Sequence, residues 1–263
     1  MIKICSRFFS SLCGLLFLAG ASAQSLEVTY LANAGFMLKS GDLVAIIDGI
    51  LERETYGMYA ALPEAVYADL LAGNPPFEEV DVLLFTHEHE DHFQSAATYN
   101  YLQKHPDTLV VAPPQVIDRL GIDNDNVISV WPEQGEVLEH NAGGVQVELM
   151  QLSHGRRQHA DVENLAQVVH LGGFTVLHLG DAAMEEFSFG TYDLGQRWFD
   201  VVIVPYWFFK SAPGQSIIKR QIKANHIIAA HIPPAELDEV KAMLAKDWPD
   251  VIVFDDTLDT RTF

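Results

Sequence analysis

The feature that most constrains this chain is the cluster of possible metal ligands in residues 86–92, which read Thr-His-Glu-His-Glu-Asp-His. An apolar run, Val-Leu-Leu-Phe, directly precedes it and shows no polar alternation, which is typical of a strand buried on both faces. Side chains at positions i and i+2 of an extended chain point the same way, so His87 and His89 are placed to bind one metal ion together. Asp91 and His92 follow where the strand must end, and a turn there directs this pair toward a second ion.

The same kind of ending recurs elsewhere in the chain, because several apolar segments each end in a histidine or an aspartate. Apart from residues 86–92, the side chains at such ends are Asp48, His154, Asp181 and His231. Ligand types gathered at the ends of several strands indicate a shared cleft at one edge of the sheets. Imidazole and carboxylate ligands without sulfur favour zinc, with manganese or iron as alternatives.

The number of candidate ligands decides between two kinds of metal site. A structural zinc site is usually closed, four-coordinate and rich in cysteine, and seven ligands are too many for one such ion. We therefore expect two divalent ions that share a bridging carboxylate and keep open positions for water. The seven candidate ligands are His87, His89, Asp91, His92, His154, Asp181 and His231.

Residues 1–23 have the pattern of a secretory signal peptide. They combine a basic start, a short apolar run and the small-residue site Ala21-Ser22-Ala23, which predicts cleavage before Gln24 rather than an uncleaved anchor. The mature protein is then periplasmic or secreted. Both cysteines of the chain leave with this segment, so the mature protein has no thiol ligand or thiol nucleophile.

Charge limits the classes of partner. The chain has 16 Lys and Arg residues against 36 Asp and Glu residues, a formal net charge of −20. A surface this acidic repels nucleic-acid phosphates and anionic lipids. We therefore expect a small-molecule substrate, no nucleic acid and no stable membrane anchor. Residues 24–263 show no linker or repeat and are interpreted as one domain. Strands mixed with helices predict an α/β architecture with sheets inside and helices outside.

With these residues in place, the chain resembles the metallo-β-lactamase superfamily, whose signature is His-x-His-x-Asp-His. The resemblance implies a four-layer αββα sandwich with the site at one edge. It assigns the first metal to His87, His89 and His154, the second metal to Asp91, His92 and His231, the bridge to Asp181, and support of the motif loop to Asp48. Residues 30–36 are similar to the opening of the branch that contains ascorbate-phosphate lactonase-like proteins.

The function that this resemblance implies is hydrolysis of an ester, lactone, amide or phosphodiester bond by metal-bound hydroxide. Asp91, which orients the hydroxide, and Asp181, which bridges the ions, are the expected catalytic residues. The chain has no Gly-x-Ser-x-Gly turn for a serine nucleophile. An iron-dependent oxidoreductase on the same fold and a non-catalytic periplasmic metal-binding protein are the alternatives. The sequence leaves the substrate and the oligomeric state open.

Other segments suggest how the cleft is bounded. Residues 49–79 interrupt the strands and carry Tyr56, Met58 and Tyr59, and we interpret them as a cap over the cleft. The aromatic residues 206–209 are either core or a wall of the substrate pocket, and the proline before them favours the pocket.

Two groups of basic residues lie outside the ligand set. Arg156, Arg157 and His159 form either a solvated loop or a cationic or acidic group for the substrate. His170 and His178 are expected to be buried and hydrogen-bonded.

Overall fold

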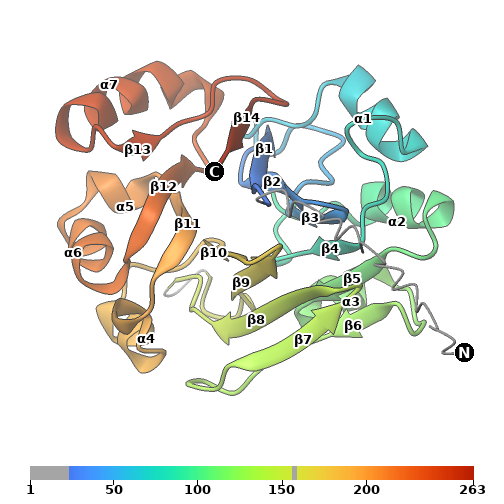
Figure 1. Cartoon of the computed structure of the whole chain (residues 1–263), viewed down its shortest axis with the longest axis horizontal. Helices are drawn as coiled ribbons and strands as arrows, with labels where there is room; N and C mark the ends of the chain where they lie inside the picture. The colour runs from blue at the N-terminus through green and yellow to red at the C-terminus, as the bar shows by residue number, and fades with distance from the viewer. Residues whose placement is uncertain (1–23, 156–158) are drawn as a thin grey trace, which may run out of the picture.

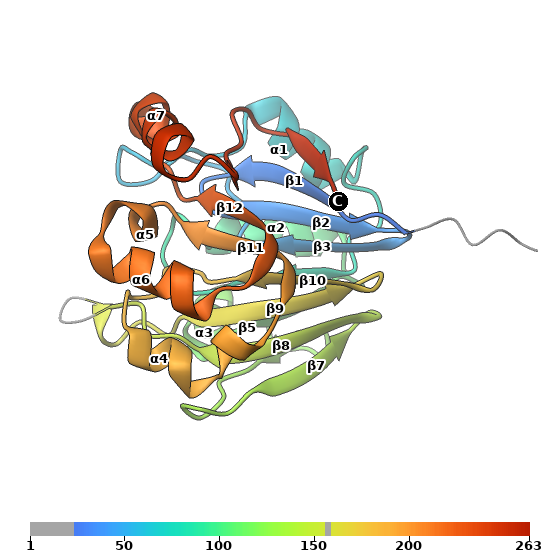
Figure 2. The same ribbon diagram turned by 60° about the vertical axis from the view of Figure 1, so that its left-hand side comes forward.

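The computed structural model describes residues 24–155 and 159–263, and in this part of the chain two seven-stranded sheets pack face to face. Helices cover both outer faces, which gives the four-layer αββα arrangement expected from the sequence (Figures 1 and 2). The predicted signal peptide, together with Arg156 and Arg157, lies outside the described residues. Among the described residues, no helix is both long enough and apolar enough to cross a bilayer.

The first sheet has the strand order β14-β1-β2-β3-β4-β5-β6. Strands β3 to β6 are parallel, whereas β14, β1, β2 and β3 pair antiparallel. The strands are β14 (Thr260–Thr262), β1 (Glu27–Ala32), β2 (Gly35–Ser40), β3 (Leu43–Ile47), β4 (Val82–Leu84), β5 (Leu109–Ala112) and β6 (Val127–Ser129).

The second sheet has the order β13-β12-β11-β10-β9-β8-β7 and the same division into parallel and antiparallel parts. Strands β10 to β13 are parallel, and β7 to β10 pair antiparallel. The strands are β13 (Val251–Ile252), β12 (Ala224–Ala230), β11 (Phe199–Pro205), β10 (Phe174–His178), β9 (Leu165–Leu171), β8 (Val145–Gln151) and β7 (Leu138–Ala142).

Three apolar layers hold these elements together. The central layer lies between the two sheets and is built from buried aliphatic side chains such as Leu38, Val147 and Val169. The outer layers lie between each sheet and its helices. The first sheet carries α1 (Glu64–Ala72), α2 (Ser95–Lys104) and α3 (Pro114–Leu120), and the second carries α4 (Glu186–Thr191), α5 (Trp207–Lys210), α6 (Ala212–Gln221) and α7 (Leu237–Asp247).

The elements that sequence reasoning did not foresee have polar or short sequences. Strand β14 reads Thr-Arg-Thr and has no apolar pattern; its pairing with β1 defines it. The sequence pattern predicts a helix over residues 217–223, whereas α6 begins five residues earlier, at Ala212. Its first turn contains a proline and a glycine, yet the Ser211 hydroxyl accepts a hydrogen bond from the Gly214 N–H at 3.2 Å and caps the helix.

Gly35, the first residue of β2, lets the β1–β2 turn approach the end of β3 closely. A Cβ atom at Gly35 would lie 2.7 Å from the Asp48 carbonyl oxygen and 2.8 Å from the Gly49 Cα, both of them backbone atoms. Backbone atoms cannot move aside as the end of a flexible side chain can. Only glycine therefore fits where these two segments meet.

We predict that Gly35→Ala destabilises the protein by about 1–3 kcal/mol, because the added methyl group overpacks against backbone. Gly190→Ala is the matched control, since a Cβ there meets no atom within 4 Å. That control should be neutral or up to about 1 kcal/mol more stable, because alanine favours the helix. Denaturant unfolding of the two variants checks this. Equal stability of the two variants would contradict the close approach at Gly35.

Candidate metal centre

The candidate site lies at the carboxyl ends of strands from both sheets. Strand β4 ends at Leu84 and runs into residues 86–92, and β3 ends just before Asp48. From the second sheet, His154 follows β8, Asp181 follows β10, and His231 directly follows β12. The structure thus brings together the seven ligand candidates that the sequence analysis singled out.

The first group of three consists of His87, His89 and His154, which we call the first triad. Its ring nitrogens face one another. The Nε2 atoms of His87 and His154 each lie 3.1 Å from Nδ1 of His89. A tetrahedral zinc ion with Zn–N bonds of about 2.0–2.1 Å holds two ligand nitrogens ~3.4 Å apart. The spacing of the first triad is therefore close to the spacing that such an ion requires.

The second group consists of Asp91, His92 and His231, which we call the second triad. His231 Nε2 lies 3.0 Å from the Asp91 carboxylate oxygen Oδ2, and His92 Nε2 lies 3.7 Å from the same oxygen. All three residues are buried.

Asp181 lies between the two triads and contacts both. Its Oδ1 lies 3.3 Å from His92 Nε2, and its Oδ2 lies 3.3 Å from His231 Nε2. The same Oδ2 lies 3.5 Å from His154 Nε2 in the first triad. One buried carboxylate thus faces imidazoles of both groups, which is the geometry of a bridging ligand.

Asp48 orients the histidines without belonging to either triad. Its carboxylate accepts hydrogen bonds from the Thr86 N–H at 2.8 Å and from the Thr86 hydroxyl at 2.6 Å, and it lies 2.7 Å from His92 Nδ1. The Thr86 hydroxyl in turn lies 3.0 Å from His87 Nδ1. Both rings therefore use Nδ1 for this network and direct Nε2 into the centre, as is typical of metal-binding histidines.

The buried polar atoms show that this donor set fits a cation. His92 Nε2, His231 Nε2 and Asp181 Oδ1 are buried without a hydrogen-bond partner of proper geometry. Unpartnered buried polar atoms are rare because each one costs free energy. Converging nitrogen and carboxylate atoms of this kind match the ligand preferences of zinc and related divalent ions.

The electrostatics differ between the triads. Burial keeps the pKa of His87 well below its usual value and lowers the pKa of His154 to about 4, so these rings are neutral donors. Burial also opposes a charge on His231, but the Asp181 and Asp91 carboxylates outweigh it and raise its pKa to about 9. Burial raises the pKa of Asp181, yet His231 and His92 hold it well below its usual value. Protons on the second triad therefore balance the carboxylates, and a bound cation would replace them.

Gly180 fixes the approach of Asp181 to the centre. Its φ is +56°, and a Cβ there would lie 2.3 Å from Asn164 Oδ1. That oxygen accepts a hydrogen bond from the Asp181 N–H at 3.0 Å, and Asn164 Nδ2 donates to the Leu152 carbonyl at 2.8 Å. Asn164 thus links the loop of Asp181 to the segment that leads to His154.

A pocket of about 370 Å³ opens onto the centre. Tyr56, Met58 and Tyr59 line it together with His159 and four of the candidate ligands. The interpretation of residues 49–79 as a cap thus agrees with where these three side chains lie. Tyr56 and Met58 are 61% and 52% exposed, so the wall that they form faces solvent as well as the centre.

The aromatic residues 206–209 divide between the two expected roles. Phe208 and Phe209 are buried in the layer between the second sheet and its helices. Trp207 instead packs its ring against His231, with centroids 4.9 Å apart, and Tyr59 packs on the same imidazole at 4.6 Å. Only part of the run therefore reaches the site.

Histidines outside the ligand set mostly follow expectation. His178 is buried and hydrogen-bonded, with Nε2 donating to the Ala34 carbonyl at 2.9 Å. His170 differs from the prediction, because its side chain is 31% exposed and pairs with Glu148 at 2.7 Å. His170 is the next-to-last residue of β9.

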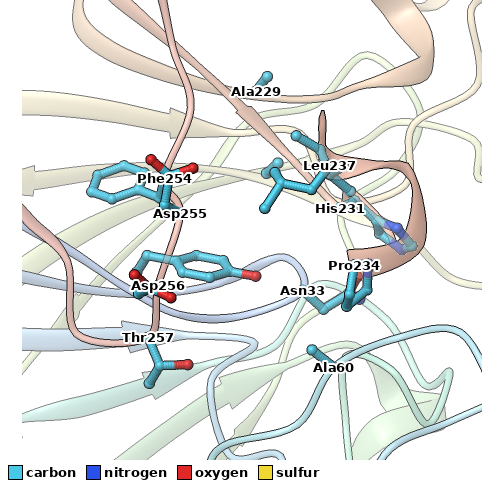
Figure 3. Close-up of a pocket in the computed structure, with 13 residues that line it drawn as sticks. Asn33, Ala60, Ala229, His231, Pro234, Leu237, Phe254, Asp255, Asp256 and Thr257 are labelled. Atoms are coloured by element: carbon cyan, nitrogen blue, oxygen red, sulfur yellow. The ribbon is translucent and has the colours of Figure 1, made fainter. Parts of the chain in front are cut away.

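A second, smaller pocket of about 180 Å³ lies behind the second triad. Figure 3 shows His231, Asn33 and Pro234 at one end of it and Asp255, Asp256 and Thr257 at the other. His231 and Asn33 therefore lie between this pocket and the metal centre. The remaining lining residues are Tyr30, Ala60, Ala229, Ala230, Ile232, Leu237 and Phe254.

Known structures share this fold. Over 91% of this chain and 100% of its own, the metallo-β-lactamase fold protein YhfI from Bacillus subtilis superposes with a TM-score of 0.64 at 17% identity. An isothiocyanate hydrolase from Delia radicum gut bacteria covers 90% of this chain and 99% of its own, with a TM-score of 0.64 and 17% identity. CmlA, a diiron β-hydroxylase from Streptomyces venezuelae, covers 91% of this chain and 54% of its own, with a TM-score of 0.53 and 15% identity.

No curated protein matches the chain in sequence. Residues 27–230 match the family model described as Beta-lactamase superfamily domain. This match covers most of the described residues and includes six of the seven candidate ligands; His231 directly follows it. The chain therefore belongs to the β-lactamase superfamily and has the metallo-β-lactamase fold.

Proposed function

We propose that this protein is a hydrolase that holds two divalent metal ions, zinc in preference to manganese or iron. The observation that carries the proposal is the position of Asp181, whose carboxylate faces imidazoles of both triads. The first ion would be held by His87, His89 and His154, and the second by Asp91, His92 and His231. Such ions lower the pKa of a bound water and polarise the oxygen of the bond to be cleaved.

The chain's own residues prepare this centre for hydrolysis. The Asp48 carboxylate holds His87, through Thr86, and His92 in the orientation that ligands need. Asp91 is buried beside the second triad and also lines the open pocket, so its carboxylate is placed to orient the attacking water. Asp181 also lines this pocket, so the reacting bond would lie against both carboxylates.

The substrate that fits is a small molecule with an ester, lactone, amide or phosphodiester bond. The open pocket has about 370 Å³, which suits a small ligand, and Tyr56, Met58 and Tyr59 give it an apolar wall. The isothiocyanate hydrolase that shares the fold acts on a small molecule as well.

An iron-dependent oxidoreductase is the alternative, favoured by the likeness to the diiron hydroxylase. The three imidazoles of the first triad support zinc more strongly.

We further propose that the protein is exported and cleaved before Gln24. The first strand begins at Glu27, so cleavage would leave both sheets complete. N-terminal sequencing of protein recovered from the native host's envelope or medium should begin at Gln24. A chain that retains Met1 or stays in the cytoplasm would contradict export.

We predict that hydrolysis depends on bound metal and on Asp91. The test is a panel of esters, lactones, amides and phosphodiesters, assayed with protein loaded with zinc or manganese. A strong chelator should abolish turnover of the substrate found, and restoring the ion should recover it. Asp91→Ala should lower kcat by about two to four orders of magnitude, because it removes both a ligand and an orienting group.

Ser153→Ala is the matched control for this assay. Ser153 is next to His154, but it is exposed, and among the residues that the structure describes its hydroxyl donates a hydrogen bond to the Gly155 carbonyl at 3.3 Å. Its loss should leave kcat unchanged if no side-chain nucleophile is used. Full activity in the chelated protein or in Asp91→Ala would refute the proposed function, and so would the absence of turnover on the whole panel.

A further inference from the structure

The turn between β1 and β2, formed by Asn33 and Ala34, lies against the second triad. Asn33 is 2% exposed. Its side-chain Nδ2 donates to the Asp91 backbone carbonyl at 2.9 Å and lies 3.3 Å from the Asp91 carboxylate oxygen Oδ2. Both neighbours are acceptors, so the amide nitrogen must be the atom that faces them.

The backbone of the same turn contacts the other ligand loops. The Asn33 carbonyl accepts a hydrogen bond from the His231 N–H at 3.0 Å. The Ala34 carbonyl accepts one from His178 Nε2 at 2.9 Å, and His178 Nδ1 accepts from the Gly180 N–H at 3.0 Å. Asp91, His231 and the loop of Asp181 are therefore tied to one two-residue turn.

The conformation of Asn33 supports a role beyond turn formation. Its φ is +52°, a left-handed conformation that asparagine tolerates better than most residues. An asparagine that serves only its own turn bonds to nearby backbone. Here the amide instead reaches Asp91, 58 positions away in the sequence. Figure 3 shows Asn33 and His231 at the same end of the smaller pocket.

The two triads differ in their relation to this turn. Within the described residues, the hydrogen bonds of Asn33 reach Asp91 and His231 of the second triad and no member of the first. In the first triad, His87 is oriented through Thr86 and Asp48, and Asp48 also contacts His92 of the second triad. A change at Asn33 should therefore act on one metal position and spare the other.

We propose that Asn33 is a positioning residue that sets the affinity of the second metal position relative to the first. The inference rests on the proposed dinuclear function. The amide prevents the Asp91 carboxylate from turning away, while the Asn33 carbonyl holds the backbone of His231. Together they keep the two ligands converged, with His231 Nε2 at 3.0 Å from Asp91 Oδ2.

The main test is Asn33→Gly, which removes the amide but accepts the left-handed backbone without strain. Metal-free protein is titrated with Co²⁺ and with Zn²⁺, by calorimetry and by the visible absorption of bound cobalt. The first ion should bind with wild-type affinity. The second should bind about 10–100-fold more weakly, as is typical when a group that orients a metal ligand is lost.

Two further variants separate positioning from folding. Asn33→Asp keeps the size and the left-handed tolerance but places a carboxylate oxygen against Asp91, so it should weaken the second ion at least as much. Asn141→Gly is the matched control, because Asn141 also stands at a hairpin and its Oδ1 accepts from the Gly144 N–H at 3.1 Å. It should bind both ions as the wild type does, and thermal unfolding of the metal-free proteins reports on the fold of all three.

The outcomes distinguish this inference from the proposed function. Two ions in the wild type with a selective loss of the second in both Asn33 variants supports the positioning role. Two ions in the wild type with no loss, or with equal loss of both ions, overturns it and leaves the dinuclear function standing. A wild type that binds a single ion contradicts the dinuclear function and this inference together.

Discussion

The arrangement of the site follows from burying three carboxylates, Asp48, Asp91 and Asp181, among histidines at the edge of two sheets. A buried carboxylate is costly unless it is paired and hydrogen-bonded. The Asp48 carboxylate is paired in this way with Thr86 and His92. The Asp181 carboxylate is only partly paired, because its Oδ1 has no hydrogen-bond partner of proper geometry. A cation would supply the missing partner, so the centre suits a cation.

The residues of the centre come from both sheets. The first sheet supplies residues 86–92 and Asp48, and the second supplies His154, Asp181 and His231. The ligands therefore converge only when the two sheets pack together. At Gly180, which follows β10, an added Cβ would lie 2.9 Å from the Cβ of Thr86, which follows β4, so the loops from the two sheets approach closely there. Different ligands line the two pockets: His89, Asp91, His154 and Asp181 line the open pocket, whereas His231 lines the smaller one.

Much of the fold and the ligand set could be predicted from the sequence, because strong local patterns carry them. Apolar runs that end in His or Asp, such as the run before His87, indicate both a buried strand and a ligand at its end. Asn33, Asn164 and Gly180 could not be found in this way. Their roles depend on contacts with distant parts of the chain, and neither an asparagine nor a glycine is a usual side-chain ligand of zinc. Strand β14 is missed for a similar reason, since only its pairing with β1 defines it.

The central claim is that Asp181 bridges two metal ions, and anomalous X-ray diffraction at the zinc edge from crystals of the zinc-loaded protein tests it most directly. The account predicts two anomalous peaks, one among His87, His89 and His154 and one among Asp91, His92 and His231, with the Asp181 carboxylate between them. A single peak, or two peaks that the Asp181 carboxylate does not join, would contradict it.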